Sequence, residues 1–239
     1  YRVLRLDFRG HGLSDRAPGE YVTAGWISDA AAVCRQVAGA PCLVVGHSLG
    51  GGTAAGLAQQ HPELVRAIAL EDPALGFVPR EGENALEGNS LLDVFRLMRE
   101  SIPQLQASGM TAETLTPVIA AAPSPTGEPF AATAHPDAIA ATASSMLAVD
   151  ASVLDPVLSG TVPNLVDLSA PIPVPTLIVA ADPASPDCVA RPEVTGLVER
   201  TSPQVAVHTL AGAGHLIPDH LVYRDQFLAL VLEFFAKQG

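Results

Sequence analysis

Ser48 is the residue whose sequence surroundings point most directly to chemistry. It lies at the centre of the segment GHSLG, residues 46–50, which matches the pattern G-x-S-x-G. An apolar run at residues 42–45 precedes the segment, and a run of small residues at 53–60 follows it. A strand, a tight turn and a helix in this order lift a serine hydroxyl above a sheet and direct free backbone N–H groups at an oxyanion. The pattern predicts a nucleophilic serine, with glycines at both ends of the turn to relieve crowding; the other interpretation is that Ser48 only caps the helix.

A serine hydroxyl needs a general base, and His215 is the best candidate. It follows the last predicted strand, residues 205–210, and precedes the last predicted helix, residues 221–237. This position places it at the carboxyl edge of a parallel sheet, where Ser48 is also expected. His47 is adjacent to Ser48 in the chain and is not expected to turn back on it. The other histidines are interpreted as turn, cap, strand, helix-end or surface residues, and no pair has zinc-ligand spacing: His11, His61, His135, His208 and His220.

The third member of a catalytic triad is a carboxylate that orients the histidine and stabilises its protonated form. Asp72 and Asp182 each follow a predicted strand, residues 67–70 and 176–180. Each also precedes a proline, so the other interpretation is that the aspartate only ends its strand in a turn. Glu71 and Asp187 are the remaining alternatives.

The predicted elements alternate between strands and helices, which indicates an α/β fold with a mostly parallel sheet and helices on both faces. The composition changes between residues 73 and 170, which are rich in Pro, Ser and Thr. The helices predicted there are short, and one of them has Asn89 or Ser90 as its N-cap. We therefore expect a core of residues 1–72 and 171–239 and a helical insertion of residues 73–170. The predicted strands are residues 1–8, 42–45, 67–70, 176–180 and 205–210, and the predicted helices are residues 26–37, 53–60, 91–101, 136–150, 192–201 and 221–237.

The composition of the chain argues against several classes of partner. The 239 residues are 48% hydrophobic and 16% charged, which is typical of a globular domain. A net charge of −12 argues against partners such as nucleic acid or an anionic membrane, and no apolar run reaches the roughly 20 residues of a membrane helix. Three cysteines without metal-like spacing, Cys34, Cys42 and Cys188, indicate reduced thiols and a cytoplasmic protein.

Four segments resemble sequence blocks of the α/β-hydrolase family, in the family's order. They are residues 7–14 (DFRGHGLS), 46–51 (GHSLGG), 175–179 (PTLIV) and 212–215 (GAGH). The resemblance covers residues 1–75 and 171–239 and implies that the insertion is a cap (lid) over the active site. It also implies that the Leu49 N–H binds the oxyanion and that no metal or other cofactor is needed.

The resemblance favours Asp72 as the acid and keeps Asp182 as the alternative. The spacing of Asp72 from Ser48 resembles hydrolases whose acid follows the sixth strand, such as haloalkane dehalogenases and zearalenone-type lactonases. Asp182 follows the strand that carries the acid in most of the family, but it comes directly after Ala181, where the family block reads Gly-x-x-Asp.

The resemblance implies a serine hydrolase that cleaves a carboxylic ester or lactone of a small, largely apolar substrate through an acyl-enzyme. The alternatives are a carbon–carbon bond hydrolase and a non-catalytic ligand-binding scaffold. Epoxide hydrolase and dehalogenase activities are disfavoured, because both resemble families that carry Asp at the elbow position where this chain has Ser48. The expected partners are the hydrophobic substrate and, in a homodimer, a second copy of the chain.

The start of the chain departs from the family pattern. Position 1 is Tyr, the chain opens on what resembles the fourth family strand, and no His-Gly block supplies a second oxyanion donor. We expect that residues before Tyr1, or another chain, fill a slot beside residues 43–45, because unpaired strand groups inside a core are costly.

Overall fold

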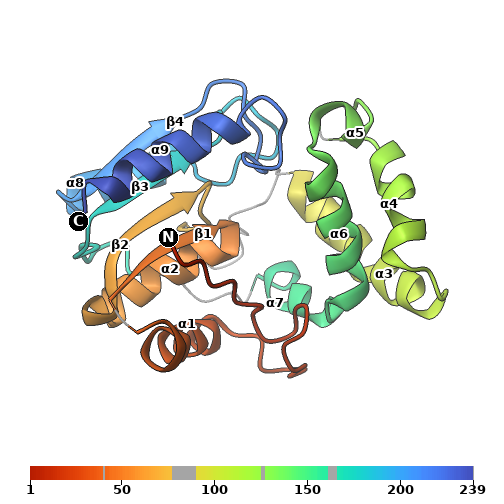
Figure 1. Cartoon of the computed structure of the whole chain (residues 1–239), viewed down its shortest axis with the longest axis horizontal. Helices are drawn as coiled ribbons and strands as arrows, with labels where there is room; N and C mark the ends of the chain where they lie inside the picture. The colour runs from red at the N-terminus through yellow and green to blue at the C-terminus, as the bar shows by residue number, and fades with distance from the viewer. Residues whose placement is uncertain (40, 77–89, 125–126, 161–165, 239) are drawn as a thin grey trace.

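The computed structural model describes all residues except 40, 77–89, 125–126, 161–165 and 239 (Figure 1). The described residues form one four-stranded sheet in the order β1-β2-β3-β4, and each neighbouring pair is parallel. The strands are β1 (Cys42–His47), β2 (Val65–Glu71), β3 (Thr176–Ala180) and β4 (Val205–Thr209). Helix α2 (Ser48–Gln60) and a 3-10 turn (Pro62–Leu64) connect β1 to β2, and α8 (Pro192–Thr201) connects β3 to β4. The predicted parallel α/β sheet is confirmed.

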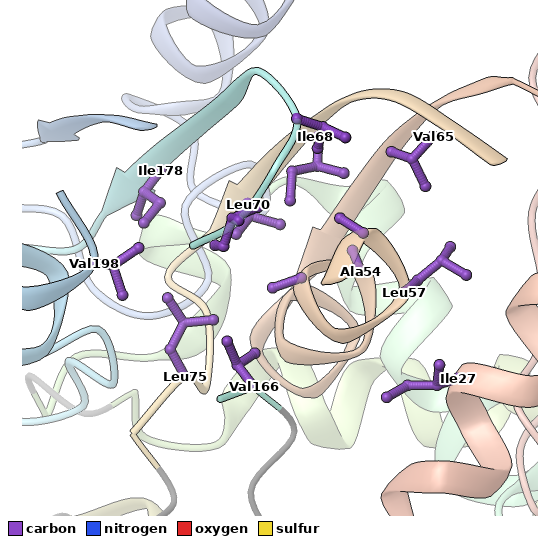
Figure 2. Packing of buried hydrophobic residues seen from close by; sticks show 14 of the residues in the cluster. Ile27, Ala54, Leu57, Val65, Ile68, Leu70, Leu75, Val166, Ile178 and Val198 are labelled. Atoms are coloured by element: carbon purple, nitrogen blue, oxygen red, sulfur yellow. The ribbon is translucent and has the colours of Figure 1, made fainter. Parts of the chain in front are cut away.

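Both faces of the sheet are covered, because the side chains of β2 and β3 alternate between two apolar layers. Ile68 and Leu70 pack with α2, α8 and α1 (Thr23–Val33) on one face (Figure 2). Ala67 and Ala69 pack with α9 (Arg224–Ala236) on the other. The expected apolar side of the last helix is buried there through Phe227, Val231 and Phe235, among others. Continuously apolar strands are the sequence signature of such a two-sided burial.

Strand β1 is an edge strand among the described residues, and this corrects the expectation that residues 42–45 are buried on both faces. It pairs with β2 alone, and the Val45 side chain is exposed. Residues 1–8, predicted to be a strand, contain none, because no described strand pairs with them. Their large apolar side chains Tyr1, Val3, Leu4 and Leu6 are exposed. Residues 1–6 line an open groove of about 850 Å³ together with β1 and α1.

The predicted first helix is confirmed and begins earlier, at Thr23. Its last turn, Cys34–Ala38, widens to a π-helix and ends at Gly39, whose φ is 75°. Glycine adopts this left-handed conformation without steric cost, which explains the sharp end of the helix.

Most of the segment between β2 and β3 is helical. It contains α3 (Ser90–Ala107), α4 (Ala112–Ala121), α5 (Phe130–Thr133), α6 (Pro136–Ala148), a 3-10 turn (Ala151–Leu154) and α7 (Asp155–Leu158). Helices α3 to α6 lie together to one side of the sheet (Figure 1). The third helix continues past the predicted end at Ser101 and contains Pro103, because the buried Ile102 holds it in place. Its N-cap position, Asn89, lies outside the described residues.

Two contacts tie this helical segment to the rest of the chain. The Tyr21 hydroxyl donates to Oδ2 of Asp150 at 2.7 Å, and the Asp150 N–H donates to the Gly10 carbonyl, also at 2.7 Å. Val153 completes a small apolar cluster with Tyr21 and Trp26. Within the described residues, no single helix has the length and hydropathy to cross a bilayer; α6 and the following residues 151–158 reach them only together, with a bend of 101°.

Candidate active site

Ser48 lies at the junction of β1 and α2, as the sequence predicts. Its φ is 50°, a left-handed value that a non-glycine residue rarely adopts. Such strain is typical of functional positions, where the surrounding structure holds the backbone in place. The turn places Ser48 at the carboxyl edge of the sheet, and the Leu49 N–H lies in the first turn of α2, where backbone donors lack helical acceptors.

Two glycines make this turn sterically feasible, but they are not the two expected. A Cβ on Gly46 would overlap the Gly50 carbonyl, and a Cβ on Gly51 would lie 2.7 Å from Cβ of Pro73. A Cβ on Gly50 would meet nothing closer than a Phe8 ring atom at 4.0 Å. The crowding therefore involves Gly46 and Gly51, and the expectation for Gly50 was wrong, because a Cβ at that position would have room beside the Phe8 ring.

His215 lies in the loop after β4, at the same edge of the sheet as Ser48. Its side chain is buried, and its Nδ1 atom lies 2.6 Å from Oδ2 of Asp72. No hydrogen bond joins His215 to Ser48 among the residues that the structure describes. In structures without substrate such bonds are often long and shorten only when substrate binds.

Asp72 directly follows β2 and is fully buried, with a φ of 34°. Its Oδ1 accepts hydrogen bonds from the backbone N–H groups of Ala181 and Ala190 at 3.1 and 3.0 Å. Its Oδ2 accepts one from the Val189 N–H at 2.9 Å, beside that with His215. Burial alone would raise the pKa of Asp72, but the bonds from His215 and the backbone outweigh it and lower the pKa. Asp72 is therefore an ionised carboxylate aimed at the imidazole.

Asp182 lies in a different environment. Its carboxylate accepts from the Gly212 N–H at 2.6 Å and the Ala184 N–H at 2.8 Å, and these bonds lower its pKa. It makes no contact with His215 in the described structure. Asp182 thus holds a turn, which is the other interpretation that the sequence allowed for one of the two aspartates.

The two remaining acidic alternatives hold the backbone of the His215 loop and do not bond its ring. Oδ2 of Asp187 accepts from the His215 N–H at 3.1 Å, and Oε1 of Glu71 accepts from the Ile217 N–H at 3.0 Å. Burial, and then the neighbouring Asp219, raise the pKa of Glu71 well above its ordinary value.

His47 is the residue at this edge that sequence reasoning missed. Its ring centroid lies 4.4 Å from that of His215, and its Nε2 atom lies 3.1 Å from the His215 carbonyl oxygen. Burial, and then the proximity of His215, lower the pKa of His47. The contact spans 168 positions of sequence, so no local pattern could have indicated it.

Four of the other histidines occupy the places expected of them, but His220, expected at the surface, is half-buried with its ring 4.8 Å from that of Tyr223. His11 lies in the turn after Phe8, His61 ends α2, His208 lies on β4, and His135 caps α6 through its Nδ1 atom. Among the described residues, no three His, Cys, Asp or Glu side chains are arranged to hold a metal ion.

A cavity of about 510 Å³ lies between the inserted helices and the start of the chain. Asp7, Phe8, His11 and Asp219 line it from the core, and Ser48 and His215 are not among its lining residues. Apolar side chains line it from the insertion: Met98, Ile102, Ala138, Met146, Val149 and Val153.

Comparison with known proteins identifies the family. A sequence profile of the alpha/beta hydrolase family matches residues 1–229. The chain belongs to the alpha/beta hydrolase family. It is 33% identical over 87 residues to a 2-(acetamidomethylene)succinate hydrolase of Mesorhizobium japonicum, covering 36% of this chain and 31% of that protein. It is 41% identical over 70 residues to a 2-hydroxymuconate semialdehyde hydrolase of Pseudomonas putida, covering 29% and 25%. The aligned parts thus span less than a third of these two relatives.

Solved structures of this alpha/beta hydrolase fold agree with the architecture. The crystal structure of E-2-(acetamidomethylene)succinate hydrolase superposes with a TM-score of 0.67 at 23% identity, covering 96% of this chain and 80% of that chain. An esterase from Exiguobacterium antarcticum superposes with a TM-score of 0.62 at 18% identity, covering 95% and 79%. At these identities the likeness establishes the fold.

Proposed function

We propose that this chain is a serine hydrolase that cleaves a carboxylic ester or lactone of a small, largely apolar substrate. The observation that carries the proposal is the 2.6 Å contact of Asp72 with Nδ1 of His215, at the sheet edge from which Ser48 projects. A carboxylate on Nδ1 fixes the tautomer in which Nε2 is free to accept a proton. The left-handed backbone conformation of Ser48 and the match of residues 46–50 to the family's nucleophile elbow support the same assignment.

In the proposed reaction Ser48 Oγ attacks the substrate carbonyl carbon while Nε2 of His215 takes the hydroxyl proton. The Leu49 N–H stabilises the oxyanion, and Asp72 stabilises the imidazolium. His215 then returns the proton to the leaving alkoxide, and an acyl-enzyme remains on Ser48. Water, deprotonated by His215, attacks the acyl group and releases the acid, which restores the serine.

We also propose that residues 73–170 act as a cap over this site and bind the substrate. The 510 Å³ cavity is lined mostly by apolar side chains of α3, α6 and the following turn, beside Asp7, His11 and Asp219, and this lining supports a largely apolar substrate. The three free cysteines, two of them buried, support a cytoplasmic location.

The test is a panel of nitrophenyl esters and lactones hydrolysed by the wild-type chain and by two matched variants. Ser48→Ala should lose at least about a thousandfold in kcat, since removal of a triad nucleophile has that effect. Ser144→Ala, an exposed serine on α6, should behave as wild type. A fluorophosphonate probe should label the wild type and Ser144→Ala, and leave Ser48→Ala unlabelled. Hydrolysis or labelling that persists in Ser48→Ala would refute the assignment.

A second candidate function is hydrolysis of a carbon–carbon bond in a diketone. The match to a 2-hydroxymuconate semialdehyde hydrolase favours it. The same residues would serve, so the panel should include a vinylogous 1,5-diketone. Turnover of that compound with none of the esters would favour the second candidate.

A further inference from the structure

We propose that His47 is a positioning residue that holds the His215 loop through a hydrogen bond from its Nε2–H to the His215 carbonyl. This inference rests on the proposed function for its kinetic readout, although the contact itself does not depend on any substrate. His47 precedes the nucleophile in the chain, so one short segment, the end of β1, would place both the serine and the support of its base.

The geometry requires a defined form of His47. A carbonyl oxygen only accepts hydrogen bonds, so the 3.1 Å contact means that Nε2 of His47 carries a proton. The ring also lies against that of His215, at 4.4 Å between centroids and 46° between planes. The imidazole of His215 is therefore held on both sides: Asp72 binds its Nδ1 atom, and His47 contacts its face and its carbonyl.

The surroundings favour a neutral His47. Its Nε2 atom lies 3.8 Å from Oε1 of Glu71. Burial raises the pKa of Glu71, so this side chain is a poor counter-ion for an imidazolium. The direction of the His47 pKa, which burial and His215 lower, agrees with this. A neutral ring avoids repulsion when His215 becomes cationic during the reaction, while a permanent charge at this distance would oppose it.

Two other hydrogen bonds hold the backbone of this loop, and neither involves the His215 carbonyl. Asp187 accepts from the His215 N–H, and Glu71 accepts from the Ile217 N–H. The His215 carbonyl, which lies between those two groups in the chain, receives its bond from His47. Loss of that bond would leave the ring tied only by Asp72 and free to tilt relative to Ser48.

Three substitutions separate the hydrogen bond from the ring. His47→Gln keeps an N–H donor near the Nε2 position, His47→Met has a similar length without a donor, and His47→Phe keeps the ring without a donor. We expect Phe and Met to lower kcat by about 10- to 100-fold with little change in KM, because a small misplacement of a reacting group has that effect. Gln should stay within about threefold of the wild type, a change that corresponds to little lost transition-state stabilisation. His208→Phe, at an exposed histidine on β4, is the control and should match the wild type.

A second readout does not need turnover. The proton between His215 Nδ1 and Asp72 should give a far-downfield proton NMR signal because the contact is short. We expect this signal to weaken in His47→Phe and His47→Met and to persist in His47→Gln, with circular dichroism confirming that each variant is folded. The inference would be wrong if His47→Phe and His47→Met kept both the wild-type kcat and the signal. It would also be wrong if His47→Gln lost kcat and the signal to the extent expected for His47→Phe and His47→Met. A wild type that neither hydrolyses nor labels would contradict the proposed function, and the NMR comparison would still decide the role of His47.

Discussion

Oδ2 of Asp72 and Nδ1 of His215 lie 2.6 Å apart, although 143 positions separate them in the chain. Asp72 follows β2 and His215 follows β4, so the contact crosses the end of β3, which lies between these two strands in the sheet. The loop after β3 also contributes, because three of its N–H groups donate to the same carboxylate. A buried charge is tolerated when it is satisfied in this way, and it orients its histidine as a result.

The acid assignment predicts a large difference between two asparagine substitutions. Asp72→Asn should lower kcat by several orders of magnitude, because an amide on Nδ1 allows the wrong tautomer of His215. Asp182→Asn should stay near the wild type, since that side chain only bonds the backbone of Gly212 and Ala184. Steady-state kinetics on the best ester of the panel provides the measurement. Comparable losses in both variants, or a larger loss at Asp182, would overturn the assignment.

The sequence predicted that Ser48 and His215 lie at the same edge of the sheet, because both positions depend on local order: strand, turn, helix. It favoured Asp72 as the acid and kept Asp182 as the alternative, because both follow buried strands and both precede proline. The choice depends on which carboxylate the loop after β3 surrounds, and that is a property of tertiary packing. The same holds for β1, whose apolar run is typical of a fully buried strand, although among the described residues it pairs only with β2.

The left-handed backbone conformation at position 48 should cost more free energy with serine than it would with glycine. Its φ of 50° costs a side-chain-bearing residue on the order of 1–2 kcal/mol, which glycine avoids. Ser48→Gly should therefore have a higher Tm than Ser48→Ala, by roughly 2–4 °C per kcal/mol for a chain of this size. Calorimetry of the two inactive variants measures the difference directly. Equal Tm values would mean that the elbow stores no such strain.

The buried Glu71 predicts a pH-dependent stability. Burial and then Asp219 raise its pKa, so the folded state keeps a proton that the unfolded state loses. Its contribution to stability therefore falls as pH rises from the ordinary glutamate pKa to the raised one, and is constant above that. Glu71→Gln removes this loss and retains an oxygen for the Ile217 N–H.

We expect the Tm of Glu71→Gln to exceed that of the wild type at pH 8 and to approach it at pH 4, below which both states hold the proton. Each kcal/mol of relieved cost raises Tm by roughly 2–4 °C. Glu113→Gln, at an exposed position in α4, is the control and should change stability by less than about 0.5 kcal/mol at either pH. A gain at pH 8 no larger than at pH 4 would show that the pKa of Glu71 is not raised in the folded protein.

The three glycines of the elbow predict three different results for alanine. Gly46→Ala should destabilise the protein by about 1–3 kcal/mol and abolish activity, because its Cβ overlaps the Gly50 carbonyl and the backbone at Ser48 must shift. Gly51→Ala should also destabilise, since its Cβ would lie 2.7 Å from Cβ of Pro73, next to Asp72. Gly50→Ala meets only open space within α2 and should raise stability by about 0.5–1 kcal/mol, the helix preference of alanine over glycine. Thermal unfolding together with fluorophosphonate labelling distinguishes these outcomes. A Gly50→Ala variant as damaged as Gly46→Ala would mean that the turn is crowded at its second glycine, as the sequence pattern alone implied.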